Sequence, residues 1–373
     1  MSHRLTLGLP NMHQEAGERR AFLPDFVRKA AKRGYHIVLE HGYGAGMGLT
    51  ADDYCRAAPD VRFAPLEDVY AQDIVLVLRY PGDHELHLMR PGATLISMVH
   101  YPTRPMRVER LRDLGLEAIS LDSVVDDRGQ RLIENLRAVG WNGMREAMRV
   151  LRDRYPAPGF DSPARPPIQV TLLGAGAVGG HVMRAAPFYG DPALRAEMLA
   201  AGAPGVMLTV VDYDITPHEP IMRDLLAETD LLVDATQRPD PSTPVIPNDW
   251  IAVMPDHAVL LDLSVDPYHC DDDEPIVKGI EGIPQGNLDQ YVFMPDDPAW
   301  DTLPECVNAL HRRAAVSCYS WPGVYPQDCM QIYGDQISPL LRTIQRAGGV
   351  ANIDPAGRFF ARATSRAMLS RLP

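Results

Sequence analysis

The sequence predicts an α/β protein whose strands form mostly parallel sheets, and three observations support this class. Short, continuous apolar segments alternate with segments whose apolar residues recur at helical spacing, as expected of strands covered by helices on both faces. A glycine-rich loop opens a second series of this kind near the middle of the chain. The length of 373 residues corresponds to about two domains at roughly 150 residues each.

The first half of the chain begins with a short strand and continues with alternating helices and strands. A helix is expected over residues 23–33, because its apolar residues recur at helical spacing and Gly34 follows as a stop signal. The segment DIVLVL at 73–78 is apolar after its first residue, which is typical of a strand buried on both faces. The other strands expected here lie at 5–9, 36–40, 94–99 and 118–121.

The second half of the chain repeats this alternation. A helix is expected at 143–155, and the proline- and glycine-rich segment PAPGFDSPARPP that follows it is a loop or linker. A long irregular stretch covers residues 267 to about 299. The strands expected in this half lie at 168–173, 207–211, 231–235 and 258–263, and two further helices lie at 331–348 and 355–372.

The charge and hydropathy of the chain exclude some classes of partner. Lys and Arg number 36 against 49 Asp and Glu, which gives a formal net charge of -13. Binding to nucleic acids or to anionic membranes depends on cationic side chains, so neither is expected. No apolar run reaches the roughly 18 residues of a membrane helix, and the first residues lack an apolar signal segment. We therefore expect a cytoplasmic protein.

The cysteines and the acidic residues do not predict a metal site. The cysteines are scattered and form no CxxC pair, so we expect free thiols at Cys55, Cys270, Cys306, Cys318 and Cys329. The acidic run at 271–274 is interpreted as a solvated loop, because no histidine or cysteine stands at ligand spacing beside it. One compositional feature is unusual: only Lys29, Lys32 and Lys278 are lysines, and all other cationic residues are arginines.

The segment IQVTLLGAGAVGGHV carries the pattern GxGxxG between a buried-type strand and an apolar helix, which is the context of a dinucleotide-binding loop. Gly174 permits the tight turn, Gly176 lets the backbone approach the diphosphate, and Gly179 lets helix and strand pack closely. Val178 lies in the same loop as a further candidate contact. The alternative is a tight turn between strand and helix that binds no ligand.

The strand after this loop, in the segment MLTVVDYD, ends in Asp212. A carboxylate here would accept hydrogen bonds from the ribose hydroxyls and repel a 2′-phosphate, so NAD is favoured over NADP as the cofactor. The interval between Gly174 and Asp212 is longer than the usual ~20 residues, because the segment YGDPALRAEMLAAGAPG lies between them.

Sequence blocks spread over nearly the whole chain share the pattern of one family. They are GLPNMHQEAGERRAFLP with the following glycine-rich turn and DDY, VLVLRYP, LISMVHYP, LLDLSVD and WPGVYPQDCMQIYGDQISPLL. These blocks resemble the alanine dehydrogenase superfamily, which includes transhydrogenase nucleotide domains and lysine-forming saccharopine dehydrogenase. Chain length, DDRGQR, HCDDDEPI and the C-terminal block point to the saccharopine dehydrogenase branch, whereas the glycine loop is more similar to alanine dehydrogenase.

The resemblance implies two Rossmann-like domains in a discontinuous arrangement. The substrate domain would comprise residues 1–137 and 322–373, and the NAD-binding domain, residues 138–321, would be inserted between them. The active site would lie in the cleft between the domains, at the C-terminal ends of the strands, where open α/β sheets bind ligands.

The resemblance also gives roles to individual polar residues. Arg19 aligns with the family arginine that binds a substrate carboxylate, which a guanidinium grips with two hydrogen bonds, and the neighbouring Arg20 is the alternative. His100 follows the strand at 94–99 and matches the catalytic histidine, since imidazole exchanges protons near neutral pH. Asp266, at the end of LLDLSVD, would lie near the nicotinamide and orient a water molecule or the amine.

Arg79 departs from the family pattern, which has a lysine here that contacts the substrate and takes part in acid–base chemistry. Arginine stays protonated and is a poor general base, so the exchange is not conservative. Either Arg79 holds a second substrate carboxylate while His100 transfers every proton, or the site has changed its substrate or lost its activity. We favour the first interpretation.

Asp122 and Arg131 match saccharopine dehydrogenase positions near a second carboxylate or the amine, so they join Arg19 and Arg79 as candidate substrate ligands. The resemblance therefore implies an NAD-dependent oxidoreductase acting on the CH–NH bond of an opine-type secondary amine or an amino acid, with saccharopine-type chemistry as the main expectation. The alternatives are a simple alanine-type dehydrogenase and a non-catalytic NAD-binding protein. The expected partners are small amino and 2-oxo acids, and the sequence does not fix the oligomeric state.

Overall fold

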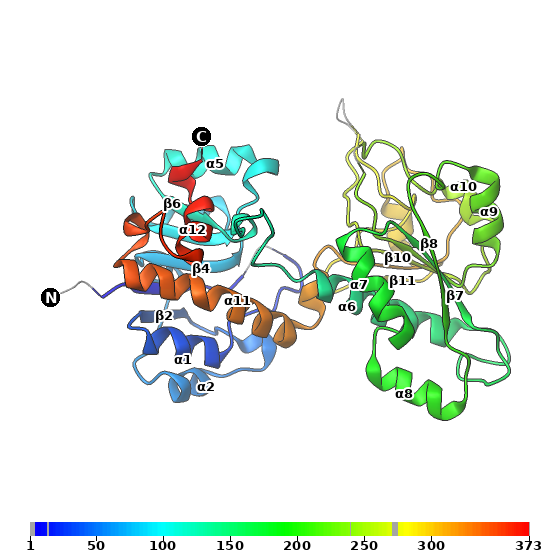
Figure 1. Ribbon diagram of the computed structural model, residues 1–373, viewed down its shortest axis with the longest axis horizontal. Coiled ribbons are helices and arrows are strands. Elements are labelled where there is room, and N and C mark those ends of the chain that lie inside the picture. Colours follow the sequence, from blue (N-terminus) through cyan, green and yellow to red (C-terminus); the bar gives the residue numbers. More distant parts are fainter. Residues whose placement is uncertain (1–3, 13–14, 239, 271–274, 373) are drawn as a thin grey trace. The chain divides into compact units, whose positions relative to one another are not determined.

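The structure is a computed structural model, and it describes every residue except 1–3, 13–14, 239, 271–274 and 373. The chain forms two compact units (Figure 1). The first comprises Met1–Asn135 and Tyr325–Pro373, and the second comprises Leu136–Val324. The chain thus leaves the first unit, builds the second as one continuous stretch, and returns to the first.

The first unit contains a six-stranded parallel sheet in the order β3-β2-β1-β4-β5-β6. This is the strand order of a doubly wound α/β domain. The strands are β1 (Thr6–Leu9), β2 (His36–Glu40), β3 (Arg62–Ala64), β4 (Ile74–Arg79), β5 (Thr94–Met98) and β6 (Glu117–Ser120). The helices are α1 (Pro24–Lys32), α2 (Ala51–Ala57), α3 (Leu66–Tyr70), α4 (Asp83–His87), α5 (Pro105–Asp113), α11 (Pro326–Ala347) and α12 (Phe359–Arg366).

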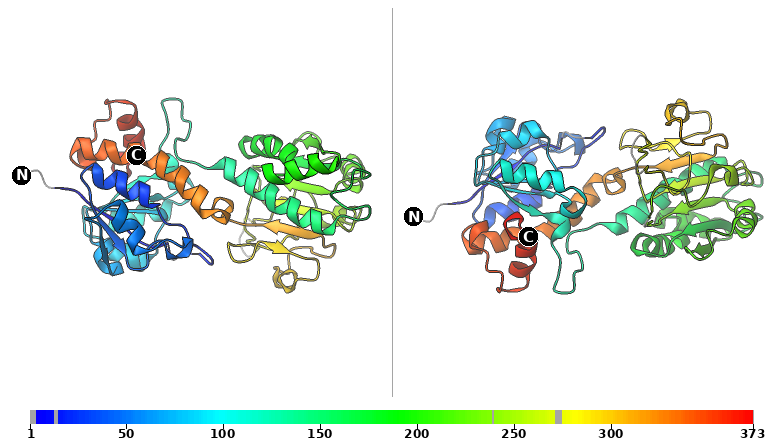
Figure 2. Two further views of the ribbon diagram at one scale, coloured as in Figure 1. Left: turned by 90° about the horizontal axis from the view of Figure 1, so that it is seen from below. Right: turned by 90° about the horizontal axis from the view of Figure 1, so that it is seen from above.

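Strand β4 shows why strands of this sheet carry apolar residues on both faces. Its alternate residues Ile74 and Leu76 belong to the apolar cluster that contains residues of α1 and α11, which lie side by side (Figure 2). Val75 and Val77, which alternate with them along the strand, belong to the cluster that contains Leu111 of α5. Both faces of the strand are therefore buried, as the sequence predicts.

The second unit contains a six-stranded sheet in the order β11-β12-β10-β9-β7-β8, in which only β11 is antiparallel to its neighbour. The strands are β7 (Ile168–Leu173), β8 (Val206–Val211), β9 (Leu231–Asp234), β10 (Val259–Asp262), β11 (Val292–Phe293) and β12 (Ala314–Ser317). The helices are α6 (Leu136–Arg154), α7 (Ala177–Ala185), α8 (Pro192–Ala201), α9 (Glu219–Ala227) and α10 (Asn248–Ile251). The predicted α/β class with two Rossmann-like sheets is confirmed.

Helix α6 begins well before the expected position near residue 143. Gly140 and Gly143 weaken the helical signal of the sequence, but tertiary packing requires them. A Cβ at Gly140 would lie 2.8 Å from the Cβ of His181, and one at Gly143 would lie 2.4 Å from a methyl group of Leu263. The glycines thus let α6 approach α7 and the end of β10, and these packing contacts outweigh their low helix propensity.

Two other expectations need correction, and a third cannot be compared with the structure. The C-terminal helix is shorter than predicted, because α12 covers only Phe359–Arg366 and a 3₁₀ turn follows at Leu369–Arg371. Cys270 and Cys306 form a disulfide, with 6.4 Å between their Cα atoms, whereas Cys55, Cys318 and Cys329 are free. Loop packing brings the pair together across 36 residues, which scattered spacing cannot show. The acidic run at 271–274 lies outside the described residues.

In the described part of the chain, no helix has the length and apolar character needed to cross a membrane.

Candidate active site

The glycine loop joins β7 to α7, and two of its three predicted glycines, Gly174 and Gly179, have a steric reason. Gly174 has a φ of +86°, a conformation that side chains disfavour. A Cβ at Gly179 would lie 2.2 Å from the carbonyl oxygen of Gly174, so only glycine lets the helix pack this closely on the turn. Gly176 caps the N-terminus of α7, and a Cβ built on it would point into open space. The loop therefore presents backbone to a ligand at the helix N-terminus.

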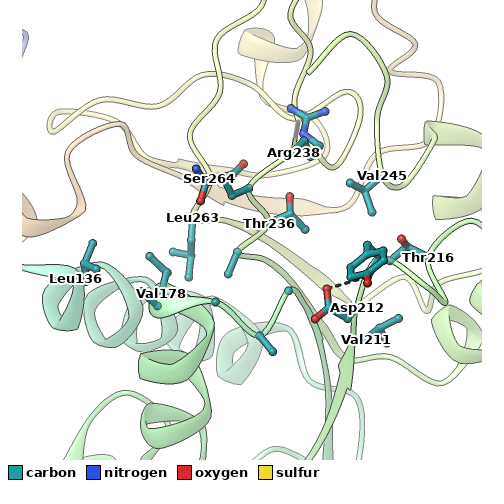
Figure 3. Close-up of a pocket in the computed structure, with 17 residues that line it drawn as sticks. Leu136, Val178, Val211, Asp212, Thr216, Thr236, Arg238, Val245, Leu263 and Ser264 are labelled. Atoms are coloured by element: carbon teal, nitrogen blue, oxygen red, sulfur yellow. Dashed lines mark hydrogen bonds between the residues drawn. The ribbon is translucent and has the colours of Figure 1, made fainter. Parts of the chain in front are cut away.

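A pocket of about 880 Å³ lies in front of this loop (Figure 3). It is lined by the loop and by the residues that follow β8, β9 and β10, at the C-terminal edge of the sheet. Four predicted cofactor residues line it, namely Gly174, Gly176, Val178 and Asp212. The sequence prediction missed Thr236, Gln237, Arg238 and Ser264, which also line it but belong to no local motif.

The pocket residues fit a dinucleotide. The open space beside Gly176 and the free N–H groups of the first turn of α7 suit a diphosphate. Asp212 follows β8, the strand next to β7, where a carboxylate can accept hydrogen bonds from ribose hydroxyls. The fold and the pocket together define the second unit as a dinucleotide-binding α/β domain.

Asp266 follows β10 in the second unit, and its carboxylate is held by an arginine. Its Oδ2 lies 2.7 Å from Nη2 of Arg238, whose side chain is only 8% exposed. The Asp266 side chain is 34% exposed, so it remains accessible to small molecules. Asp262, four residues earlier, is fully buried at the end of β10.

His100 lies in the first unit just after β5 and is paired with Asp122. The Oδ1 atom of buried Asp122 accepts hydrogen bonds from the backbone N–H of His100 at 3.1 Å and from the hydroxyl of Ser120 at 2.7 Å. Its Oδ2 lies 3.5 Å from the His100 ring nitrogen Nδ1. The imidazole itself is 42% exposed. Asp122 is thus placed to orient a solvent-accessible imidazole.

The charges of three arginines act on the protonation of this histidine. Burial lowers the pKa of His100 below its ordinary value, the carboxylate of Asp122 opposes this, and the cations Arg107, Arg131 and Arg79 lower the pKa further. Arg107, which the sequence prediction missed, lies on α5 with its guanidinium 4.4 Å from the ring centre of Tyr80. Among the predicted residues, Asp122 thus contacts His100, and Arg79 and Arg131 act on it through their charges.

Arg79 forms an ion pair with Glu15, a residue the sequence prediction also missed. The side chains of both residues are largely buried. The pairing joins the end of β4 to the N-terminal motif, which residue spacing alone does not reveal. The positive charge of Arg79 is therefore accompanied by the carboxylate of Glu15.

The two arginines of the N-terminal motif have different environments. Glu18 accepts hydrogen bonds from the backbone N–H groups of both Arg19 and Arg20 and forms a buried ion pair with the Arg20 side chain. Arg20 is 5% exposed, whereas the Arg19 side chain is exposed. Arg19 is therefore the more accessible of the two arginines.

Opposite shifts of the His100 pKa are expected from two single substitutions. Arg107→Gln removes a neighbouring positive charge, so the pKa of His100 should rise. Asp122→Asn removes the negative charge that favours the imidazolium, so the pKa should fall. NMR titration of the His100 ring, assigned by its loss in His100→Gln, measures both shifts. Shifts of the same sign, or none, would contradict this account of the site's electrostatics.

The chain matches the model of the family described as alanine dehydrogenase/PNT, N-terminal domain, over residues 8–134. Alanine dehydrogenase of Bacillus subtilis is 24% identical over 70% of this chain and 71% of that protein. Alanine dehydrogenase of Mycolicibacterium smegmatis is 22% identical over 72% and 75%. The NAD(P) transhydrogenase subunit alpha of Haemophilus influenzae is 22% identical, and the match covers 53% of this chain but 41% of that subunit.

Solved structures show the same fold. An L-alanine dehydrogenase superposes with a TM-score of 0.72 at 18% identity, covering 98% of this chain and 94% of that one. A transhydrogenase from Sinorhizobium meliloti gives a TM-score of 0.62 at 17% identity, covering 91% and 93%. These findings show that the chain is similar to alanine dehydrogenases and, over residues 8–134, to the alanine dehydrogenase/PNT N-terminal domain. They do not show the particular resemblance to saccharopine dehydrogenase that we expected from the sequence.

Proposed function

We propose that the protein is an NAD-dependent dehydrogenase that oxidises the carbon–nitrogen bond of an amino acid to give a 2-oxo acid and ammonia. The observation that carries the proposal is the His100–Asp122 pair among arginines in one unit, in a chain whose other unit holds a dinucleotide pocket. The similarity to alanine dehydrogenases favours this simple oxidation over the saccharopine-type reaction.

The first unit supplies the groups that bind the amino acid and move its proton. The exposed guanidinium of Arg19 binds the substrate carboxylate with two hydrogen bonds. His100 accepts the proton of the substrate ammonium, and Asp122 fixes the orientation of the ring and stabilises the imidazolium that forms. The lowered pKa of His100 keeps the imidazole neutral, and so able to accept a proton, to more acidic pH.

The second unit supplies the groups that hold NAD, which when bound accepts the hydride from the substrate carbon. Gly174, Gly176 and Gly179 shape the loop for the diphosphate, and Asp212 accepts hydrogen bonds from the ribose. Asp266, held by Arg238, orients the water that adds to the imine carbon. Over the full cycle, amino acid, NAD⁺ and water give 2-oxo acid, ammonium, NADH and one proton.

A second candidate is the oxidation of an opine-type secondary amine, which carries two or three carboxylates. The observation that favours it is the group of arginines whose charges reach His100, namely Arg79, Arg107 and Arg131. An amino acid with one carboxylate needs a single guanidinium, whereas an opine needs several. In this reading Arg79, paired with Glu15, contacts the second carboxylate.

The two reactions are separated by NADH oxidation in the reverse direction, followed through the absorbance of NADH. Pyruvate, glyoxylate and 2-oxoglutarate are each offered with ammonium, lysine or ornithine. We expect turnover with ammonium and a 2-oxo acid. Turnover only with an oxo acid and an amino acid together would establish the opine-type reaction instead. NADH binding without turnover of any pair would contradict both, and would support a non-catalytic NAD-binding protein.

A further inference from the structure

Lys278 is buried in a chain that otherwise uses arginine almost everywhere. The other two lysines, Lys29 and Lys32, lie on α1 with access to solvent. Lys278 has no exposed surface, and its Nζ lies 2.6 Å from Oδ2 of Asp262 and 2.8 Å from the carbonyl oxygen of Asp266. A buried ammonium needs such partners, because desolvation of an unpaired charge is very unfavourable.

Asp262 connects this ammonium to the turn that follows β10. Its Oδ2 also accepts a hydrogen bond from the hydroxyl of Ser317 at 2.9 Å. Its Oδ1 accepts from the backbone N–H of Val265 at 2.8 Å and lies 3.1 Å from the hydroxyl of Ser264. The carboxylate is therefore shared between Lys278 and two consecutive residues of the turn.

The backbone of this turn is strained. Val265 has a φ of +62°, in the left-handed region that a β-branched residue very rarely adopts. Such a conformation persists only where surrounding contacts over-determine it, and it is found most often at functional sites. Here the contacts are the hydrogen bond from the Val265 N–H to Asp262 and the bond from Lys278 to the next carbonyl, that of Asp266.

The turn determines where two residues of the candidate active site stand. Ser264, the first residue of the turn, lines the dinucleotide pocket (Figure 3). Asp266 is held at two points by different cations: Lys278 binds its carbonyl oxygen, and Arg238 binds its carboxylate. Two fixed points on one residue define its position far better than one.

The segment that carries Lys278 is packed tightly against the ends of the strands. A Cβ at the neighbouring Gly279 would lie 2.1 Å from Oδ2 of Asp234, the buried last residue of β9. The Gly279 carbonyl oxygen accepts hydrogen bonds from the backbone N–H groups of Val245 and Ile246. A compact ammonium on a flexible stem suits so confined a place.

We propose that Lys278 is a positioning residue: through Asp262 and the Asp266 carbonyl it fixes the turn 264–266, and so sets the place of Asp266 and Ser264 at the dinucleotide pocket. The residue touches neither substrate nor cofactor. The proposal rests on the proposed function for its catalytic consequence, but the hold of Lys278 on the turn is a property of the protein alone.

The test compares three variants with the parent protein. Lys278→Met removes the ammonium but leaves Asp262 buried without its cation. A failure of this single variant to fold would reflect that unpaired carboxylate and not the hold of Lys278 on the turn. The double variant Lys278→Met with Asp262→Asn removes both charges and keeps an oxygen to accept the Val265 N–H. Lys29→Met is the matched control, because it removes an exposed lysine that also pairs with a carboxylate. Hydrogen exchange of peptides spanning 262–268, NADH affinity and steady-state kinetics are measured on each.

We expect the double variant to fold, to exchange the amides of the turn at least about 10-fold faster, and to lose kcat by about 100-fold, with the amino-acid KM changed less than about threefold. The Lys29→Met control should match the parent protein in all three measurements. Parental exchange and parental kcat in the double variant would overturn the proposal and leave Lys278 as a purely structural ion-pair partner.

Different results would contradict the proposed function and the proposed role of Lys278. If the parent protein binds NADH but turns over no amino or oxo acid, the proposed function fails. The exchange measurement on the cofactor-free protein then still decides the proposal, since faster exchange in the double variant supports the hold of Lys278 on the turn and unchanged exchange overturns it.

Discussion

Substitution of His100 by glutamine is expected to lower kcat by about 100- to 10,000-fold, because the reaction loses the group that accepts the substrate proton. Glutamine keeps a polar side chain of similar length but cannot take up a proton near neutral pH. The loss should appear in kcat at saturating substrate, in the direction that gives turnover. NADH affinity should stay within about twofold of the parent value, since His100 belongs to the first unit and the dinucleotide pocket to the second.

His36 provides a matched control for this substitution. It is exposed at the first residue of β2 in the same unit, and we assign it no role in the reaction. The variant His36→Gln should have the parent kcat and thermal stability. Parent-level turnover in His100→Gln would show that another group transfers the proton, and the mechanism proposed above would then be wrong.

Substitution of Gly179 by alanine is expected to weaken NADH binding by at least about 10-fold, or about 1.4 kcal/mol. The new Cβ would lie 2.2 Å from the carbonyl oxygen of Gly174, so the first turn of α7 must move away from the loop. That movement displaces the backbone groups that would bind the diphosphate. Fluorescence titration of NADH measures the change.

The next residue, Gly180, separates this effect from a general effect of alanine in the helix. A Cβ at Gly180 has no other atom within 4 Å, so alanine fits without any movement. Gly180→Ala should leave NADH affinity unchanged and stabilise α7 by about 0.5–1 kcal/mol, because alanine has the higher helix propensity. Equal losses of affinity in the two variants would show that the close approach of Gly179 to Gly174 is not what shapes the site.

The sequence predicted the fold well where both faces of a strand are buried. Central strands such as β4 and β9 are apolar runs that end in one charged residue, and their pattern needs no knowledge of neighbouring elements. The short strands β3 and β12 were missed, because their segments RFA and AAVS each contain only one large apolar residue. The first turns of α6 were missed because its glycines serve tertiary packing, which local propensity does not contain.

The residues of the candidate site also fall into those that the sequence predicts and those that it does not. The glycine loop and Asp212 follow from a local motif, and the positions of His100 and Asp266 follow from strand ends. The ion pair of Arg79 with Glu15 and the contacts of Lys278 join residues far apart in the chain or on irregular loops. No spacing rule predicts such pairs, because packing of the folded chain alone brings them together. The same limit applies to the disulfide between Cys270 and Cys306.

The interrupted path of the chain has a consequence for biosynthesis. Residues of α11, including Met330, Ile337 and Ile344, complete the apolar cluster that also contains Phe26 and strands of the first sheet. When the ribosome has translated as far as Val324, every residue of the second unit has been synthesised, but the first unit still lacks this helix. Because domains generally fold as units, the inserted unit can fold first, while the N-terminal segment still has an incomplete core. That segment is then the part of the nascent chain most in need of protection by chaperones.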